Sequence, residues 1–257
     1  MRRHLIWVLA LAAMLAIAVT LSSVGGASAV PNIQTITGIF TPKKLPAHKK
    51  VPISLFVDVS ATNPGNPNNL PNATTLAKVD FDKDGAFYQK GFPTCDPSHF
   101  TAATTTQQAK DACGDSLEGD GTSIIQVPST TGGPPININA TVTAFNGKGK
   151  TLVLFTYNSL SGAQTLVGTI GPSTGGSKYG TTLTVPVPKL AGGSAVIQEF
   201  NTKVSKKYHY KGKKASYVSS TCKDKKLHFQ ARFTDDQGQT SVGTDTQKCK
   251  KKKKRHH

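Results

Sequence analysis

The chain has few of the residues on which many enzyme sites depend. Its four cysteines form no Cys-x-x-Cys pair, and its seven histidines form no His-x-His or His-Glu-x-x-His motif, so the sequence does not indicate a zinc site. Glu118 and Glu199 are the only glutamates, and they suggest no glycosidase pair. A glycine-flanked serine of the nucleophile-elbow type is also missing. We therefore predict no catalytic residues and no cofactor, while a secreted hydrolase whose site is assembled from distant Asp, His and Ser residues remains an alternative.

The single tryptophan, Trp7, lies in a segment with the features of a secretory signal peptide. A short cationic start at Met1–His4 precedes a nearly unbroken apolar run, Leu5–Leu21, and Ala27-Ser28-Ala29 is a small-x-small cleavage site. We expect residues 1–29 to be removed, which would place the mature chain outside the cytoplasm. A retained anchor is the alternative, because the apolar run is close to the ~20 residues that span a bilayer. No later segment is apolar enough to cross a membrane, so we predict no transmembrane segment after cleavage.

The rest of the chain has the patterns of short strands separated by turns. Residues 53–59 and 136–144 alternate between apolar and polar side chains, and residues 152–155 are continuously apolar. Gly, Pro, Asn, Ser and Thr fill the intervals. About ten such segments without a βαβ rhythm predict an all-β fold, an antiparallel β-sandwich of the immunoglobulin-like or jelly-roll-like type. We assign it to residues 30–249 and leave open a division into two subdomains near 128–135.

The second pair of cysteines flanks a predicted hairpin. Four cysteines at separated positions suggest disulfides in an exported protein, and the sequence alone permits three connectivities. Strands expected at 229–233 and 240–244 flank a turn-forming run that ends in Gly238. Extending this hairpin backwards brings Cys222 almost opposite Cys249, which favours local pairing.

The first pair of cysteines flanks a predicted helix. Asp96-Pro97 is a helix-start signal, and residues 101–112 contain neither glycine nor proline. One short helix between Cys95 and Cys113 could therefore be closed by a disulfide between these two residues.

Positive charge is concentrated at the C-terminal end of the chain. Residues 30–202 carry 12 lysines and 10 acidic residues, a balance of +2, whereas residues 203–257 carry 17 basic and 4 acidic residues, a balance of +13. Self-repulsion predicts a disordered basic tail at 250–257. We expect the charge to attract an anionic cell-wall or surface polymer, with a purely solubilising role as the alternative. The predicted polyanion-binding residues are Lys206, Lys207, Lys211, Lys213, Lys214, Lys250, Lys251, Lys252, Lys253, Lys254 and Arg255.

Three tyrosines are interleaved with the first group of these lysines. Tyr208, Tyr210 and Tyr217 could stack on nucleic acid bases, but such residues more often have one face packed in a hairpin. We therefore predict no specific nucleic acid partner.

The motif with the most defined chemistry is Asp80-Phe81-Asp82-Lys83-Asp84-Gly85, which matches the opening of a calcium loop. Asp80, Asp82 and Asp84 stand at positions one, three and five, followed by glycine at six. Position twelve, however, is Gly91 where a bidentate glutamate is needed, and Lys83 adds a positive charge. These three aspartates are thus a weak metal candidate, and a strand that ends at Phe81, followed by a polar turn at Asp82–Gly85, explains the same residues.

An ordered set of short motifs resembles a group of uncharacterised exported actinobacterial proteins. The resemblance covers most of the mature chain and implies a secreted, disulfide-bearing, β-rich domain with no established activity. It supplies no catalytic or binding residues. The motifs are Gly91-Phe92-Pro93-Thr94-Cys95, Ala112-Cys113-Gly114-Asp115, Glu118-Gly119-Asp120-Gly121-Thr122, Phe145-Asn146-Gly147, Gly180-Thr181-Thr182-Leu183, Pro186-Val187-Pro188, Thr221-Cys222-Lys223-Asp224 and Phe229-Gln230-Ala231-Arg232-Phe233.

Together these observations predict a secreted or cell-surface protein without enzymatic activity, retained by contact between its basic C-terminal region and anionic surface polymers. A calcium-dependent adhesion or carbohydrate-binding module is the other alternative. Its mark would be exposed aromatic side chains or an occupied carboxylate loop.

Overall fold

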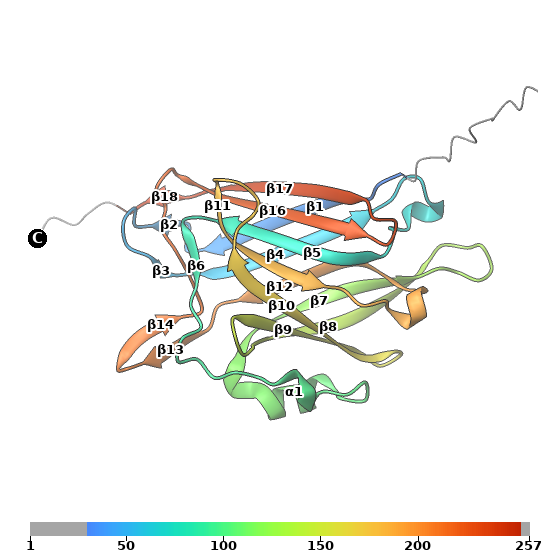
Figure 1. Ribbon diagram of the computed structural model, residues 1–257, viewed down its shortest axis with the longest axis horizontal. Coiled ribbons are helices and arrows are strands. Elements are labelled where there is room, and N and C mark those ends of the chain that lie inside the picture. Colours follow the sequence, from blue (N-terminus) through green and yellow to red (C-terminus); the bar gives the residue numbers. More distant parts are fainter. Residues whose placement is uncertain (1–29, 253–257) are drawn as a thin grey trace, which may run out of the picture.

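The computed structural model describes residues 30–252, and nearly all of its regular structure is β. The expected signal peptide and residues 253–257 lie outside the described residues. Eleven strands form one antiparallel sheet (Figure 1). In spatial order they are β1 (Ile33–Thr41), β4 (Ser54–Thr62), β12 (Val196–Val204), β7 (Leu117–Val127), β8 (Ile136–Asn146), β9 (Thr151–Asn158), β10 (Gly162–Pro172), β11 (Tyr179–Pro186), β5 (Thr74–Asp82), β16 (Lys226–Asp235) and β17 (Thr240–Lys248).

Short elements complete the described chain. Two small sheets and a parallel strand pair lie at one end of the large sheet, and one α-helix lies against its outer face (Figure 1). None of the helices within residues 30–252 has the length and apolar character needed to cross a membrane. The remaining elements are β2 (Lys44–Leu45), β3 (Val51–Pro52), β6 (Gly85–Phe87), β13 (Lys207–Tyr210), β14 (Lys213–Ser216), β15 (Val218–Ser220), β18 (Lys250–Lys251), α1 (Thr106–Cys113), and the 3₁₀ turns η1 (Pro67–Asn69), η2 (Pro97–His99), η3 (Gly114–Ser116) and η4 (Ala191–Gly193).

The two edge strands of the large sheet, β1 and β17, lie against each other, so the sheet is nearly closed and barrel-like. No backbone ladder joins these edges in the described part of the chain. Instead, the Gly38 N–H donates a hydrogen bond to the Asp245 carboxylate at 2.8 Å. The approach is close at Gly243, where a Cβ would stand 2.9 Å from the Gln34 carbonyl oxygen, so any larger residue would push the edges apart. We refer to this contact as the seam.

The inner face of the rolled sheet contains the main core. Burial alternates strictly along β16, where Phe229 and Phe233 point inward and are buried. Phe81 packs edge-on against Phe229, with ring centroids 6.5 Å apart, and against Phe87 at 4.8 Å. Such edge-to-face pairs add to the stability gained from burial of the rings. The alternation that predicted half-buried strands thus reflects one face turned to an enclosed interior.

The segment from Cys95 to Cys113 covers the outer face of β8 and β9. Phe100 packs on Phe145 and Phe155, with centroids 5.7 and 4.9 Å away, and both of these rings are fully buried. Residues 152–155 are continuously apolar because Leu152 and Leu154 belong to the inner core, while Val153 and Phe155 lie under this cover. The layer outside β8 and β9 thus consists of a loop and one helix.

The short helix between the first two cysteines is confirmed, but it begins later than the sequence signal suggested. Asp96 accepts a hydrogen bond from the Ser98 N–H and caps the 3₁₀ turn η2. The α-helix begins after Thr105, whose hydroxyl accepts from the Gln108 N–H while the Gln108 side chain returns to the Thr105 N–H, a capping box.

Both predicted disulfides are confirmed. Cys95 bonds to Cys113, and Cys222 bonds to Cys249, which leaves no free cysteine in residues 30–252. The predicted hairpin accounts for the second pair: β16 and β17 pair from Lys226 opposite Lys248 onward, and just beyond the ladder the Cys249 N–H donates to the Lys225 carbonyl, close to Cys222 in the chain.

The all-β, antiparallel class is likewise borne out by the structure. The finer expectation of a sandwich remains a prediction. The eleven long strands belong to one rolled sheet. Residues 128–135, where a division into two subdomains was left open, form the loop between β7 and β8, which pair from Leu117 to Val127 within the same sheet. Within the tail predicted to be disordered, residues 250–252 are described. Lys250–Lys251 form β18, which pairs in parallel with β2.

Each disulfide closes a loop in the unfolded chain, so we expect each to contribute about 3 kcal/mol to the free energy of unfolding. The double variants Cys95→Ala/Cys113→Ala and Cys222→Ala/Cys249→Ala should each lose roughly this amount in urea unfolding. Non-reducing peptide mapping of the unmodified protein is the companion measurement. A peptide that links Cys95 to Cys249 would contradict the pairing.

Candidate functional site

Lysines from distant parts of the chain meet at one end of the rolled sheet, where β1 ends and β16 begins (Figure 1). We call this the basic end. Three connections bring the segments together: the Lys250 N–H donates to the Lys43 carbonyl, the Cys222 N–H donates to the Pro46 carbonyl, and Cys222 is bonded to Cys249. The resulting group of exposed side chains, the basic patch, consists of Lys43, Lys44, Lys49, Lys50, Lys223, Lys225, Lys226, Lys248, Lys250, Lys251 and Lys252.

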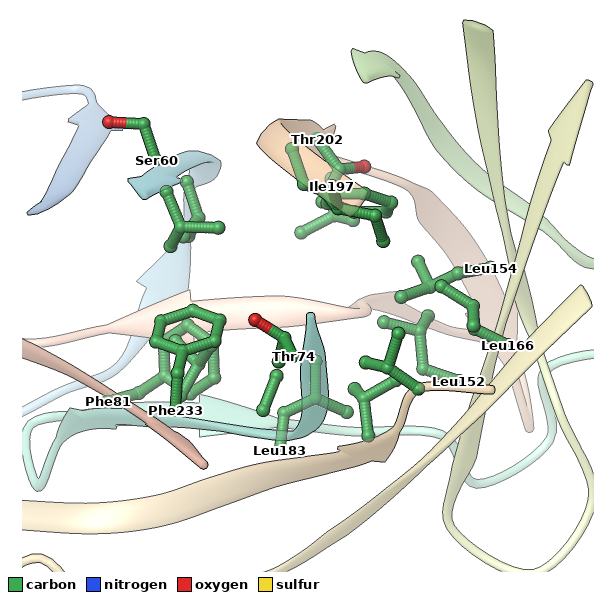
Figure 2. A pocket seen from close by; sticks show the side chains of 18 of the residues that line it. Ser60, Thr74, Phe81, Leu152, Leu154, Leu166, Leu183, Ile197, Thr202 and Phe233 are labelled. Atoms are coloured by element: carbon green, nitrogen blue, oxygen red, sulfur yellow. The ribbon is translucent and has the colours of Figure 1, made fainter. Parts of the chain in front are cut away.

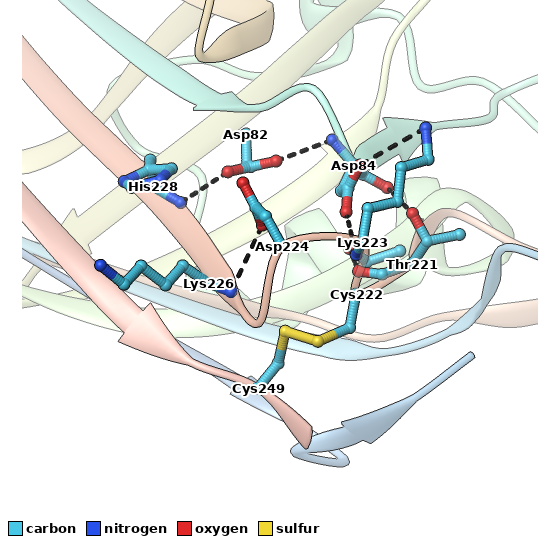
Figure 3. Close-up of a disulfide and its surroundings, with 10 residues drawn as sticks. Asp82, Asp84, Thr221, Cys222, Lys223, Asp224, Lys226, His228 and Cys249 are labelled. Atoms are coloured by element: carbon cyan, nitrogen blue, oxygen red, sulfur yellow. Dashed lines mark hydrogen bonds and ion pairs between the residues drawn. A yellow bond between two sulfur atoms is a disulfide. The ribbon is translucent and has the colours of Figure 1, made fainter. Parts of the chain in front are cut away.

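Positive charges in the basic patch are crowded. Lys226 lies directly across the ladder from Lys248. The pKa of Lys50 is lowered, first by partial burial and then by repulsion from Lys223, while Asp84 opposes the shift. Among the lysines of the patch, Lys223 has a carboxylate within ion-pair range, with its ammonium 3.6 Å from Asp84 (Figure 3). Because like charges close together repel, this surface is stabilised by any anion that binds across it.

A second basic group, the basic hairpin, is formed by residues 206–214 at the same end (Figure 1). The chain turns at Lys211 and Gly212, both with positive φ, and Lys207, Lys213 and Lys214 are exposed. The turn therefore presents its lysines to solvent at the tip of a two-stranded projection.

The tyrosines of this region are largely engaged by the protein. Tyr208 stacks on Phe92 at 4.7 Å, and its hydroxyl donates to backbone carbonyls, while Tyr217 is fully buried. Tyr210 packs against Gly91 so closely that a Cβ there would stand 1.8 Å from its ring. These rings hold the hairpin against the sheet.

The structure thus places the predicted lysines of the hairpin and those of 250–252 at the same end of the sheet, whereas Lys253, Lys254 and Arg255 lie outside the described residues. It also adds lysines that the sequence analysis did not select. Lys43-Lys44 and Lys49-Lys50 lie in the region whose overall balance is only +2, so averaging over residues 30–202 concealed them. The available signal was two Lys-Lys pairs within the eight residues 43–50.

An open cleft of about 570 Å³ lies between the base of the hairpin and the ends of β1 and β3. Lys206 and Lys207 line one side, and Pro42 and Pro52 line the other. Glu118 lies at this cleft, 3% exposed, and neither carboxyl oxygen has a hydrogen bond partner among the described residues. The register of β7 against β8 shifts at this residue, so Glu118 occupies a β-bulge that redirects its side chain.

Burial raises the pKa of Glu118 from its ordinary 4.5 to about 9, although Lys206 acts in the opposite direction. The carboxyl group is consequently protonated at neutral pH and contributes no negative charge to the cleft. Burial, and to a lesser degree the Glu118 carboxyl, raises the pKa of Tyr217 well above its ordinary value, and the Gln89 side chain partly opposes this shift. The basic end is therefore more positive than a count of acidic residues suggests.

The three aspartates of the calcium-like motif each have separate partners. Asp80, fully buried, accepts hydrogen bonds from Thr182, from Ser173 at 2.9 Å and from Arg232 Nε at 3.0 Å. The carboxylate of Asp82 accepts from the N–H groups of Asp84 and His228, both at 2.8 Å.

Burial raises the pKa of Asp82, and its two backbone hydrogen bonds oppose this shift. Asp84 accepts from the Lys223 N–H at 2.7 Å (Figure 3). Within the described ranges, no cluster of three or more His, Cys, Asp or Glu side chains is arranged to hold a metal ion. Asp82 and Asp84 instead fasten the segments that carry Lys223 and Lys226 to the sheet.

A second feature is an apolar chamber inside the rolled sheet, with a volume of about 110 Å³. Figure 2 shows Phe81, Phe233 and Leu183 facing Leu154 and Leu166 with space between them. Leaving such a volume of core empty costs about 2–3 kcal/mol, at ~24 cal/mol per Å³. An eleven-stranded wall explains the space, because about eight strands already enclose an interior that side chains just fill.

Polar residues line the chamber mainly toward the end opposite the basic end, which we call the far end. Gln34 and Thr74 lie at the beginning of β1 and β5, which start at this end. Gln198 occupies a β-bulge between Ile197 and Glu199. An adjoining cleft of about 230 Å³ shares Thr74, Val187 and Ile197 with the chamber wall. These shared side chains separate the cleft from the chamber.

Comparisons with known proteins add no relative. No family model, no curated protein and no solved structure matches the chain. The site must therefore be interpreted from its own geometry.

Glu118 makes the stability of the fold depend on pH. The folded protein keeps a proton that the unfolded chain releases above about pH 4.5, so the free energy of unfolding should fall as pH rises toward 9. The decrease is at most about 1.4 kcal/mol per pH unit. Glu118→Gln, which is neutral at every pH, should remove most of this slope in urea unfolding between pH 5 and pH 9. Glu199→Gln is the matched control and should retain it, and an unchanged slope in Glu118→Gln would contradict the assignment.

Arg232 compensates the buried charge of Asp80. Arg232→Ala would leave this carboxylate without its cation, so we expect the free energy of unfolding to fall by about 3–5 kcal/mol. Lys226→Ala, a change at an exposed lysine at the start of the same strand, should alter the free energy of unfolding by less than about 0.5 kcal/mol. Equal small effects in the two variants would show that the other hydrogen bonds suffice for Asp80.

Proposed function

We propose that this is a secreted, non-enzymatic protein that binds an anionic cell-wall or surface polymer through its basic end. The observation that carries the proposal is the convergence of the basic patch and the basic hairpin at the same end of the sheet. Two disulfides are typical of proteins in an oxidising, extracellular compartment. Export by a signal peptide and membership of an actinobacterial group of exported proteins are part of the same proposal.

The form of the site favours an extended polyanion over a single small anion. Its lysines spread over the patch, the hairpin and the cleft between them, and most of their ammonium groups have no carboxylate partner at ion-pair distance in residues 30–252. Lysine binds phosphate-type groups as a point charge and not through a fixed fork, which suits a flexible polymer with repeated charges. The protonated state of Glu118 keeps the connecting cleft free of negative charge.

The tyrosines support a polymer read by charge and not by base sequence. Tyr208 is occupied by internal packing and hydrogen bonds, and Tyr217 is fully buried. Nonspecific recognition of single-stranded nucleic acid relies on exposed aromatic rings as stacking platforms. A repeating phosphate or carboxylate backbone without bases is the ligand that this surface fits best.

The experiment measures binding of the protein to a poly(glycerol phosphate) polymer at increasing salt, by titration calorimetry. Exposed charges are screened beyond about 8 Å at physiological ionic strength, so affinity should fall steeply. The double variants Lys44→Gln/Lys226→Gln, in the patch, and Lys213→Gln/Lys214→Gln, in the hairpin, should each reduce the slope of log K against log salt by up to about two.

The matched control is Lys78→Gln/Lys189→Gln, which removes the same charge from outside the basic end. It should bind like the unmodified protein. If all three double variants lose the same affinity, net charge alone explains the binding and the proposed site is wrong.

A further inference from the structure

Three of the residues that line the apolar chamber have a buried polar atom without a hydrogen bond partner among the described residues: Gln34, Thr202 and Tyr217. The Gln34 amide is the one at the far end. Gln34 is 8% exposed and points inward from β1, and its amide nitrogen Nε2 has no hydrogen bond partner among the described residues. It lies at the far end of the chamber, opposite Ala61 on the neighbouring strand. A buried amide N–H without an acceptor is costly, so its presence at the edge of an apolar space points to a ligand that supplies the acceptor.

The chamber is built from small side chains where larger ones could fill it. Ala61, Ala77, Val57 and Val59 line its walls from β4 and β5. The nearby inward position Gly38 is different, because a Cβ there would stand 2.4 Å from the Phe229 ring, so the interior is fully packed at that point. The space is therefore local, bounded, and lined almost wholly by aliphatic and aromatic groups.

We propose that this chamber binds one small, uncharged, mainly apolar molecule. The single hydrogen-bond acceptor of this molecule accepts a hydrogen bond from the Gln34 amide nitrogen. This site is separate from the basic end, which the polymer would occupy. The ligand class follows from the lining, since apolar walls bind by desolvation and one placed polar group fixes orientation. An ionised ligand is disfavoured, because the chamber walls carry no charged residue to compensate it.

The volume sets the size of the ligand. An apolar cavity of about 150 Å³ binds benzene, so a chamber of about 110 Å³ suits a molecule of about five or six heavy atoms. Cyclopentanone and cyclopentane form a matched probe pair, because they have the same ring and differ by one carbonyl acceptor. Entry is expected at the far end, through the wall shared with the adjoining cleft.

The test is titration of the full protein with each probe, followed by NMR shifts of the methyl groups of Leu154, Leu166 and Leu183. Both probes should shift these signals with saturation, and cyclopentanone should bind about tenfold more tightly because of the amide hydrogen bond. Gln34→Leu should abolish this preference while cyclopentane still binds. Gln198→Leu is the matched control at the same end and should preserve the preference.

Two variants of the chamber walls change its volume in opposite directions. Ala77→Leu should fill the chamber and remove binding of both probes, and its melting temperature shows whether it remains folded. Leu166→Ala should enlarge the chamber and admit benzene.

The proposal is overturned if neither probe saturates, if Ala77→Leu binds as the unmodified protein does while folded, or if the ketone preference survives Gln34→Leu. The polymer-binding variants Lys44→Gln/Lys226→Gln should bind both probes normally, so this test and the test of the polymer site fail independently.

Discussion

The seam between β1 and β17 is the contact on which the rest of the structure depends. Eleven strands paired in one sheet would leave two exposed edges, and unpaired edge strands are templates for association with other chains. Here the edges meet without a ladder, through the Gly38 N–H and the Asp245 carboxylate, at a point where Gly243 permits close approach. This closure converts the inward faces of the strands into an enclosed core, and it fixes the positions of the loops at both ends.

The two ends of the rolled sheet have different chemistry because different segments arrive at each. At the basic end, the Cys222–Cys249 disulfide and the β2–β18 pair hold the C-terminal lysines beside those of residues 43–50. At the far end, the strands begin with amide and hydroxyl side chains and lead into the apolar chamber. A surface polymer and a small apolar molecule could thus be bound at once without competing. The motif that resembled a calcium loop serves this arrangement, because Asp82 and Asp84 fasten the lysine-bearing segment to the sheet.

Local signals predicted the parts of this structure that depend on neighbouring residues. The turn that ends in Gly238 defined the last hairpin, and with it the partner of Cys222. Alternating burial identified the strands, but not the rolling of one sheet into a near barrel, since the seam joins residues about two hundred positions apart. The same limit applied to the site. Lysines 43–50 join the C-terminal lysines only through tertiary contacts, and neither the burial of Glu118 nor the unpaired amide of Gln34 has a sequence pattern of its own.

The closure of the sheet is tested most directly by hydrogen exchange at the Gly38 amide, resolved by NMR. Amides within a stable sheet exchange only when the structure opens, whereas amides at an exposed edge exchange freely. The Gly38 N–H points to the β17 side, where its acceptor is the Asp245 carboxylate. If the seam is closed, this amide is protected to the same degree as those in the β1–β4 ladder, and Asp245→Ala removes the protection at Gly38 first. Exchange of the Gly38 amide at the rate of an unstructured chain in the unmodified protein would contradict the account.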